Sequence, residues 1–118
     1  MDYSTALNEV YIKSGIGNTL MSEFYKKRTQ GGWESEFSKL AVYMEWKYNM
    51  FCLENIQTEH IYDFILFLSN RGLKDSTLKH YISSYRMLYS NNTHIFSKNF
   101  ELPTNIGYEK WVKNQHKT

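Results

Sequence analysis

The chain has 118 residues, 42% of them apolar and 17% aromatic, and a formal net charge of +2 at pH 7. A chain of this length can build one hydrophobic core of ordinary size, which excludes two separate cores. The small net charge excludes the strongly basic class of nucleic-acid-binding domains, so any binding to an anion must depend on where the charges lie.

The cysteine content and the hydropathy pattern bear on the compartment. Cys52 is the only cysteine and lies between Phe51 and Leu53, so we expect a buried, reduced thiol in a reducing compartment. The N-terminal residues lack the basic and apolar regions of a signal peptide. The most apolar segment, Ile61 to Leu68, is far too short to cross a bilayer. These features predict a cytoplasmic protein without a membrane partner.

The first half of the chain contains three predicted helices. A short N-terminal helix is expected over about residues 3–14, and a second from Thr19 to about Arg28, after the Gly15-Ile16-Gly17 break. Past a second pair of glycines, the segment from Trp33 to Asn49 places apolar residues at helical spacing. On a different face of this third helix, basic and aromatic side chains recur every four residues, at Lys39, Tyr43 and Lys47.

A fourth predicted helix runs from Thr58 to Arg71, with Thr58 as its expected N-cap. Its residues are apolar almost all round, which favours a position at the centre of a bundle. Gly72 suits the left-handed backbone position that ends a helix, and Leu73 can fold its side chain back on the last turn. The sequence therefore predicts a tight turn between this helix and the next.

The fifth predicted helix, from Ser76 to Ser90, has two distinct faces. Asp75 or Ser76 is expected to cap its N-terminus. Lys79, Ser83 and Arg86 line up on one face, away from the apolar residues. Such a helix can pack on a core and contact an anion at the same time, as DNA binding requires. The buried face is predicted to hold Leu78, Tyr81, Ile82, Tyr85, Leu88 and Tyr89.

The remainder of the chain is rich in loop signals. The only proline is Pro103, and a late helix is expected from Tyr108 to about Gln115. No alternating apolar and polar run and no internal repeat are present, so a β-sheet is not expected. The predicted class is all-α, a compact orthogonal bundle of about four main helices with short extra helices at both termini.

Residues that could carry chemistry do not form a recognisable motif. The histidines and Cys52 are scattered and lack metal-ligand spacing, so no metal or other cofactor is expected. Gly15 and Gly17 lack the strand and helix that surround a phosphate-binding loop, and Glu34 and Glu36 do not face each other on a helix. We therefore expect no catalytic residues, and this chain by itself is not predicted to be an enzyme.

Four segments occur in an order that a known family shares. They are Thr58-Glu59-His60-Ile61, Phe64 to Leu68, Arg71-Gly72-Leu73-Lys74-Asp75-Ser76-Thr77, and Ile82-Ser83-Ser84-Tyr85-Arg86-Met87-Leu88-Tyr89. In this order they resemble the N-terminal core-binding domain of tyrosine recombinases, the phage integrase family, whose domain has a SAM-like helical fold. The resemblance covers roughly residues 33–90. It departs at Trp33-Glu34-Ser35-Glu36-Phe37, where the family has Thr or Ser shortly before a Tyr.

The resemblance implies a domain organisation and a function. It implies a single domain over residues 1–118, with the core-binding bundle over about residues 18–91 and a tail over residues 92–118 that leads to a catalytic domain. The family's catalytic arginines, lysine, histidines and nucleophilic tyrosine belong to that further domain, and we expect none of them here. The implied function is binding of double-stranded DNA, clamping one face of a recombination site while a C-terminal catalytic domain or other recombinase protomers hold the rest.

The candidate DNA-binding residues come from two predicted helices, over residues 34–49 and 76–90, which the resemblance directs at the major groove. These are also the helices whose non-core faces are basic and hydrogen-bonding. Lys79 and Arg86 are expected to hold phosphates, Arg86 being best suited to bidentate contact, and the backbone near Ser76 and Thr77 can donate to a phosphate. The full set is Lys39, Tyr43, Lys47, Ser76, Thr77, Lys79, His80, Ser83 and Arg86.

Three interpretations remain open at this point. The chain is the DNA-binding domain of a larger recombinase, a naturally short DNA-binding accessory factor with the same fold, or a helical protein-interaction module without nucleic-acid binding, whose aromatic residues form a partner groove. Lysines and serines also occupy ordinary solvated faces, and Lys39 or Lys47 could pair with an acid such as Glu36. Affinity that falls steeply with salt would favour the two DNA-binding interpretations.

Overall fold

The computed structural model describes residues 15–29, 31–96 and 100–115. The helix expected over residues 3–14 lies outside these ranges. The described residues form only helices, turns and loops, which confirms the all-α class. The elements are α2 (Asn18–Lys27), α3 (Glu34–Tyr48), η1 (Leu53–Asn55), α4 (Thr58–Asn70), α5 (Asp75–Asn91), η2 (Thr93–Ile95) and α6 (Asn105–Gln115), where η marks a short 3₁₀-helix.

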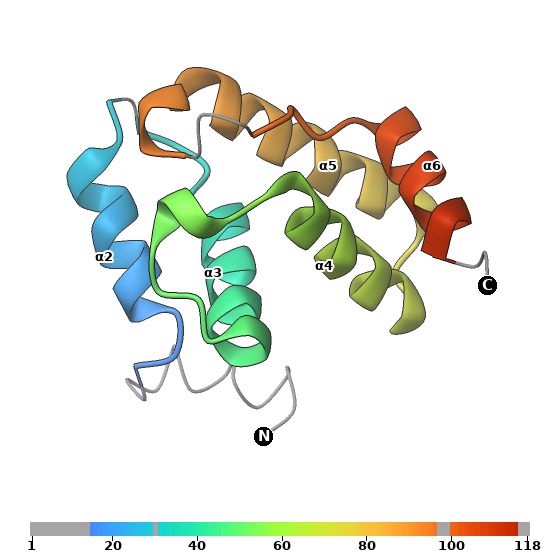
Figure 1. Cartoon of the computed structure of the whole chain (residues 1–118), viewed down its shortest axis with the longest axis horizontal. Coiled ribbons are helices and arrows are strands. Elements are labelled where there is room, and N and C mark those ends of the chain that lie inside the picture. Colours follow the sequence, from blue (N-terminus) through green and yellow to red (C-terminus); the bar gives the residue numbers. More distant parts are fainter. Residues whose placement is uncertain (1–14, 30, 97–99, 116–118) are drawn as a thin grey trace.

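Helix α3 occupies the middle of the bundle (Figure 1). It contacts α2 on one side, α4 on the other, and α5, which lies across the ends of α3 and α4. The late helix α6 packs on α4 and on the start of α5. Because α5 covers the bundle from outside, one of its faces must meet solvent. The arrangement therefore leaves α5 as the long helix with the most open outer surface.

The core is built largely from aromatic rings. Phe24 of α2 stacks on Phe37 of α3 with ring centroids 4.5 Å apart, and Tyr43 of α3 lies 4.9 Å from Phe64 of α4 by the same measure. Such pairs contribute roughly 0.5–1.5 kcal/mol beyond the burial of their area. We predicted α4 at the centre, but α3 shares that place, since almost every residue from Phe37 to Glu45 is buried.

The turn between α4 and α5 forms as the sequence predicted. Gly72 has φ of 93°, and its N–H donates to the Ser69 carbonyl at 3.0 Å. The N–H of Leu73 donates to the Leu68 carbonyl at 3.3 Å, and the Leu73 side chain packs against the core. These two bonds make a Schellman motif, which satisfies carbonyls at the end of α4. The predicted glycine stop and hydrophobic closure are confirmed.

The predicted N-caps of α4 and α5 are wrong. Helix α4 is capped by Gln57 rather than Thr58, in a capping box in which the Gln57 N–H donates to Nδ1 of His60 at 2.9 Å. The Thr58 hydroxyl instead donates to the Glu101 carbonyl. Helix α5 begins at Asp75, its N-cap is Lys74, and no described side chain caps it. The sequence placed the caps one or two residues late because hydroxyl and carboxyl side chains can cap from several neighbouring positions.

A buried carboxylate from α3 caps α2. Oε1 of Glu45 accepts the N–H of Gly17, and Oε2 accepts the N–H of Leu20, both at 2.9 Å. Gly17 has φ of 89°, and a Cβ there would lie 2.9 Å from Cγ2 of Val42, so the approach of the two helices requires glycine. Burial of Glu45 is acceptable because both of its oxygens accept hydrogen bonds.

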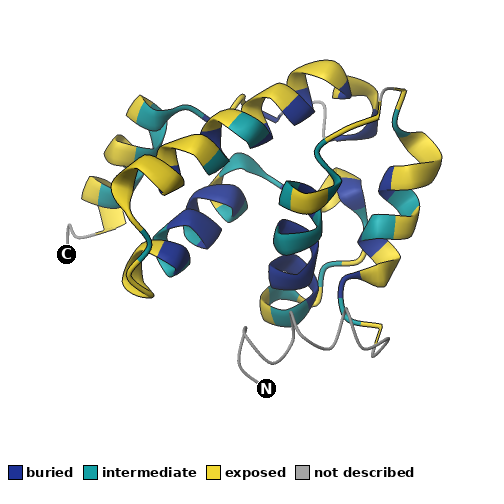
Figure 2. Cartoon of the chain, turned by 180° about the vertical axis from the view of Figure 1, so that it is seen from behind, coloured by how far each residue is buried: buried dark blue, intermediate teal, exposed yellow. Residues whose placement is uncertain are grey.

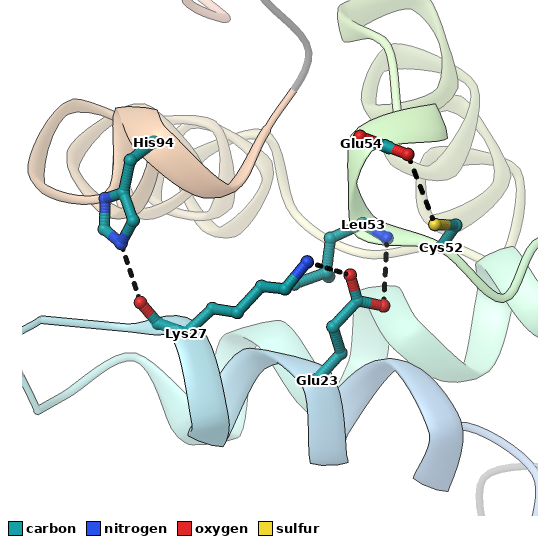
Figure 3. A network of polar contacts seen from close by, with 6 residues as sticks. All are labelled: Glu23, Lys27, Cys52, Leu53, Glu54 and His94. Atoms are coloured by element: carbon teal, nitrogen blue, oxygen red, sulfur yellow. Dashed lines mark hydrogen bonds and ion pairs between the residues drawn. The ribbon is translucent and has the colours of Figure 1, made fainter.

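The other end of α2 is tied to the segment that follows α5, through His94 of η2 (Figure 3). Nε2 of His94 lies 2.7 Å from the Lys27 carbonyl, and the buried Asn92 accepts the Thr29 N–H at 3.2 Å. Oε2 of Glu23 accepts the Leu53 N–H at 3.4 Å. Cys52 precedes Leu53 in the chain. Its thiol was predicted to be buried, but it is half-buried. Partial burial, with Glu23 and Glu54 nearby, raises the pKa of this thiol.

Candidate nucleic-acid interface

The inner face of α5 fixes which side of the helix meets solvent. Leu78, Ile82 and Tyr85 are buried, and the Tyr85 hydroxyl donates to the Glu36 carbonyl at 2.9 Å, which holds α5 against the N-terminal half of α3. The opposite side of α5 is exposed along the length of the helix (Figure 2). Six candidate residues lie on this side and are all exposed: Ser76, Thr77, Lys79, His80, Ser83 and Arg86.

Positive charge is concentrated near this face despite the small charge of the whole chain. Between residues 71 and 86 there are four basic residues, Arg71, Lys74, Lys79 and Arg86, and a single acid, Asp75. Oδ2 of Asp75 lies 3.2 Å from Nζ of Lys79, and these side chains remain 81% and 55% exposed. An exposed pair of this kind contributes only about 0.2–1 kcal/mol, so a phosphate can compete for the lysine.

Lys39 of α3 also belongs to this side of the molecule. Its Nζ donates to the Tyr81 hydroxyl at 2.8 Å and lies 5.2 Å from the centroid of the Tyr81 ring. Tyr81 in turn stacks on Tyr85, with centroids 6.1 Å apart. The hydroxyl and the face of the ring both attract the positively charged amine. The structure thus adds a cation from α3 to the edge of α5, and Tyr81, predicted only as a core residue, positions it.

Tyr43 and Lys47 do not join this face. The burial of Tyr43 contradicts its prediction as a DNA contact, whereas Lys47 is exposed on another side of α3. Tyr43 is fully buried, and its hydroxyl donates to Oδ2 of Asp63 at 2.8 Å. Nζ of Lys47 pairs with the same oxygen, and the Tyr48 hydroxyl donates to it at 2.6 Å. Lys39, Tyr43 and Lys47 share a stripe in sequence, but rotation along α3 turns Lys39 toward α5 and the other two toward Asp63 of α4.

The pKa values of the groups around Asp63 follow from burial and hydrogen bonding. Burial raises the pKa of Asp63, but hydrogen bonds from Lys47, Tyr48 and Tyr43 outweigh it and hold that pKa below its ordinary value. Burial, reinforced by Asp63, raises the pKa of Tyr48 far above its ordinary value. Burial lowers the pKa of His60, which suits its unprotonated Nδ1 in the capping box. Lys47, Tyr48 and Tyr43 therefore share one carboxylate acceptor, Asp63.

The basic run at the end of α2 is also largely paired. Nζ of Lys27 lies 3.0 Å from Oε1 of Glu23, and Arg28 forms an ion pair with Glu34 while its guanidinium lies 4.7 Å from the centroid of the Tyr25 ring. The hydrogen bond from Arg28 lowers the pKa of Glu34. These contacts hold Lys27 and Arg28 at the end of α2, so we do not assign an anion-binding site there.

Other kinds of site find no support in the part of the chain that is described. No three His, Cys, Asp or Glu side chains within residues 15–29, 31–96 and 100–115 come together as metal ligands would. None of the described helices has the length and apolar character needed to cross a membrane. No protein family model, curated protein or solved structure matches the chain. Any functional conclusion therefore depends on the site itself.

Sequence reasoning missed one residue of the exposed face. Met87 is 53% exposed and lies on α5 beside Arg86. The sequence analysis assigned it to neither the apolar nor the basic stripe. Its position four residues after Ser83 was the available signal, because residues four apart share a helix face.

Proposed function

We propose that this chain is a DNA-binding domain that uses the exposed face of α5 to bind double-stranded DNA. The observation that carries the proposal is the combination of full exposure and local charge, with four basic residues against one acid between residues 71 and 86. Phosphate contacts from lysine and arginine supply most of the affinity in such complexes. Helix α5 has 17 residues and a length of about 25 Å, and an α-helix fits the major groove of B-DNA.

The proposed contacts divide by chemistry. Lys79 and Arg86 hold phosphate oxygens, and the guanidinium of Arg86 can bind one in a bidentate manner. The backbone N–H groups of the first turn of α5, near Ser76 and Thr77, point away from the helix and no described side chain caps them. His80 and Ser83 can hydrogen-bond to bases or phosphates. Lys39 adds a positive charge at the α3 edge.

The resemblance to tyrosine recombinases gives this binding a context. In that context the chain is the non-catalytic half of a clamp, and cleavage of DNA belongs to a separate catalytic domain or to other protomers. We place this activity in the cytoplasm, where the free thiol of Cys52 stays reduced. A single half of a clamp makes few phosphate contacts, so we expect affinity of roughly micromolar strength at low salt.

Fluorescence anisotropy of a labelled duplex at 50 and 200 mM salt tests the proposal. We expect salt-sensitive binding, and we expect Lys79→Ala/Arg86→Ala to weaken it about tenfold or more and to flatten the salt dependence, since two phosphate contacts are lost. Lys26→Ala/Lys113→Ala, which removes the same charge from exposed positions on α2 and α6, is the matched control and should weaken binding far less. Absence of binding at 50 mM salt, or equal losses in the two variants, would refute the proposal.

A protein-interaction role has one observation in its favour. A surface pocket of about 480 Å³ lies at the C-terminal end of α3, lined in part by Ile16, Trp46 and the exposed Phe51. This pocket is at the opposite end of α3 from α5, so the two roles use different surfaces. Phe51→Gln should leave DNA binding unchanged if the α5 proposal is right. Loss of DNA binding in this variant would place the DNA contact at this pocket and contradict the α5 proposal.

A further inference from the structure

Four of the exposed residues of α5 are arranged in a line along the helix, which the sequence analysis did not identify. Successive residues of an α-helix are rotated by about 100°. Ser76, His80, Ser83 and Met87 follow one another at spacings of four, three and four residues, which places them in one line along the helix. The buried residues Leu78, Ile82 and Tyr85 lie on the opposite side. The line therefore forms the outermost ridge of α5, and all four of its members are exposed.

Cations lie on both sides of α5, on one side beside the ridge and on the other at the edge of the buried face. Lys79 and Arg86 lie seven residues apart on one flank of α5. Tyr81 lies on the other flank, and it holds the amine of Lys39 through the 2.8 Å hydrogen bond from Nζ to its hydroxyl. A helix in the major groove meets base edges with its outermost residues and one phosphate backbone on each side. The distribution of charge around the ridge matches that geometry.

Met87 is the one apolar side chain on the ridge. Its neighbours there, Ser76, His80 and Ser83, can each form strong hydrogen bonds, whereas Met87 offers mainly apolar surface, with a weak sulfur acceptor, and is 53% exposed. Its thioether chain is flexible and adapts to the surface it meets. In the major groove, the apolar feature of a base pair is the C5 methyl group of thymine.

We infer that the outer ridge of α5 contacts base edges and that Met87 packs against a thymine methyl group, so that the protein prefers an A·T pair at one position of its site. This inference rests on the proposed function, because it requires the α5 face to bind duplex DNA. Lys79 and Arg86 then supply affinity without base preference. Met87 supplies preference and little of the total affinity.

Thymine and uracil differ only in the methyl group, which gives a direct test. Duplexes that the wild-type chain enriches from a pool with 20 random base pairs are resynthesised with deoxyuridine in place of each thymidine in turn. We expect one substitution to weaken binding about fourfold, the size of one buried methyl group. In Met87→Gln, which keeps the side-chain length, thymidine and deoxyuridine duplexes should bind equally. Met87→Leu should retain the preference.

Two further variants separate this inference from the proposed function. Phe51→Gln changes a side chain of similar exposure, 49%, beyond the far end of α3, and should leave the thymine preference intact. Arg86→Ala should weaken binding to both duplexes equally. Binding without any thymine preference, or a preference that survives in Met87→Gln, would overturn the inference and leave the proposed function standing. Absence of binding to every duplex would overturn both.

Discussion

Two stripes of basic and hydrogen-bonding residues, one on α3 and one on α5, have similar spacing in the sequence and different roles in the structure. On α3, Tyr43 is buried, and both Tyr43 and the exposed Lys47 contact Asp63 of α4. On α5, Ser83 and Arg86 remain exposed. The difference arises because α3 has neighbouring helices on several sides, whereas α5 has a free outer face. A periodic polar stripe thus stays available at the surface only where the packing leaves it uncovered.

The largest expected effect is the loss of stability when Tyr43, the buried residue of the α3 stripe, is replaced. Tyr43→Ala removes a fully buried ring that packs on Phe64 and Phe67, and we expect the free energy of unfolding to fall by about 3–5 kcal/mol. Urea denaturation measures the change. Ser83→Ala, at the matching position of α5, should change stability by less than about 0.5 kcal/mol. Similar losses in the two variants would contradict the contrast between the stripes.

The next largest effect is expected at Asp63 of α4, which accepts hydrogen bonds from Tyr43, Lys47 and Tyr48. Because the folded-state pKa of Asp63 is depressed, its ionised form stabilises the protein above its unfolded pKa of about 3.9, and this contribution is lost as the pH falls through the folded pKa. We expect Asp63→Asn to cost about 1–3 kcal/mol at pH 7. The cost should shrink at pH 3, as urea denaturation at several pH values would show. Asp75→Asn, which changes an exposed acid of α5, is the control, and a pH-independent cost for Asp63→Asn would argue against a charged acceptor.

The two lysines of α3 should differ in their effect on DNA. Lys39→Ala removes the cation beside Tyr81 and should weaken duplex binding about threefold at 50 mM salt, because one charge near a phosphate is lost. Lys47→Ala removes an equal charge that Asp63 already neutralises, so binding should stay within about 1.5-fold of wild type. Anisotropy titrations of the two variants make the comparison. A larger loss for Lys47→Ala would reverse our assignment of the α3 residues.

The smallest expected effect is a gain in duplex affinity when Asp75 of α5 is replaced. Asp75→Asn releases Lys79 from its only described ion-pair partner and removes a negative charge from the proposed DNA face, so duplex affinity should rise about twofold. Stability should fall slightly, by about 0.3–1 kcal/mol, because an acid in the first turn of a helix favours the positive end of the dipole. Anisotropy and urea denaturation together measure both changes. A drop in affinity would indicate that Asp75 itself contacts the ligand.

Local signals of the sequence predicted much of the fold. The helical spacing of apolar residues in α3, α4 and α5 and the glycine at the α4–α5 turn were sufficient, because periodicity and left-handed backbone positions are properties of short segments. The buried face of α5 was predicted in large part. Tyr81 is half-buried, and the other five residues are buried: Leu78, Ile82, Tyr85, Leu88 and Tyr89. The partners of these helices were not predictable in the same way, since a stripe does not specify which helix covers it.

The capping of α2 shows the same limit. The sequence marks Gly17 as a break, but it gives no sign that Glu45, twenty-eight residues later, supplies the carboxylate that accepts its N–H. Acids and N–H groups pair across the fold only after the helices have docked. The thiol of Cys52 illustrates the reverse case, where apolar neighbours in sequence predicted burial and the loop before η1 left it half-buried.

The sequence by itself determined the all-α class, the positions of the long helices, the stop at Gly72 and the basic character of residues 71–86. Only the tertiary structure decided which cations stay available, because Lys47 meets Asp63, Lys39 meets Tyr81, and the outer ridge of α5 meets nothing from the described core. The physical reason is that helix periodicity depends on near neighbours, whereas the burial and pairing of a side chain depend on residues that are distant in the chain and close only in the fold.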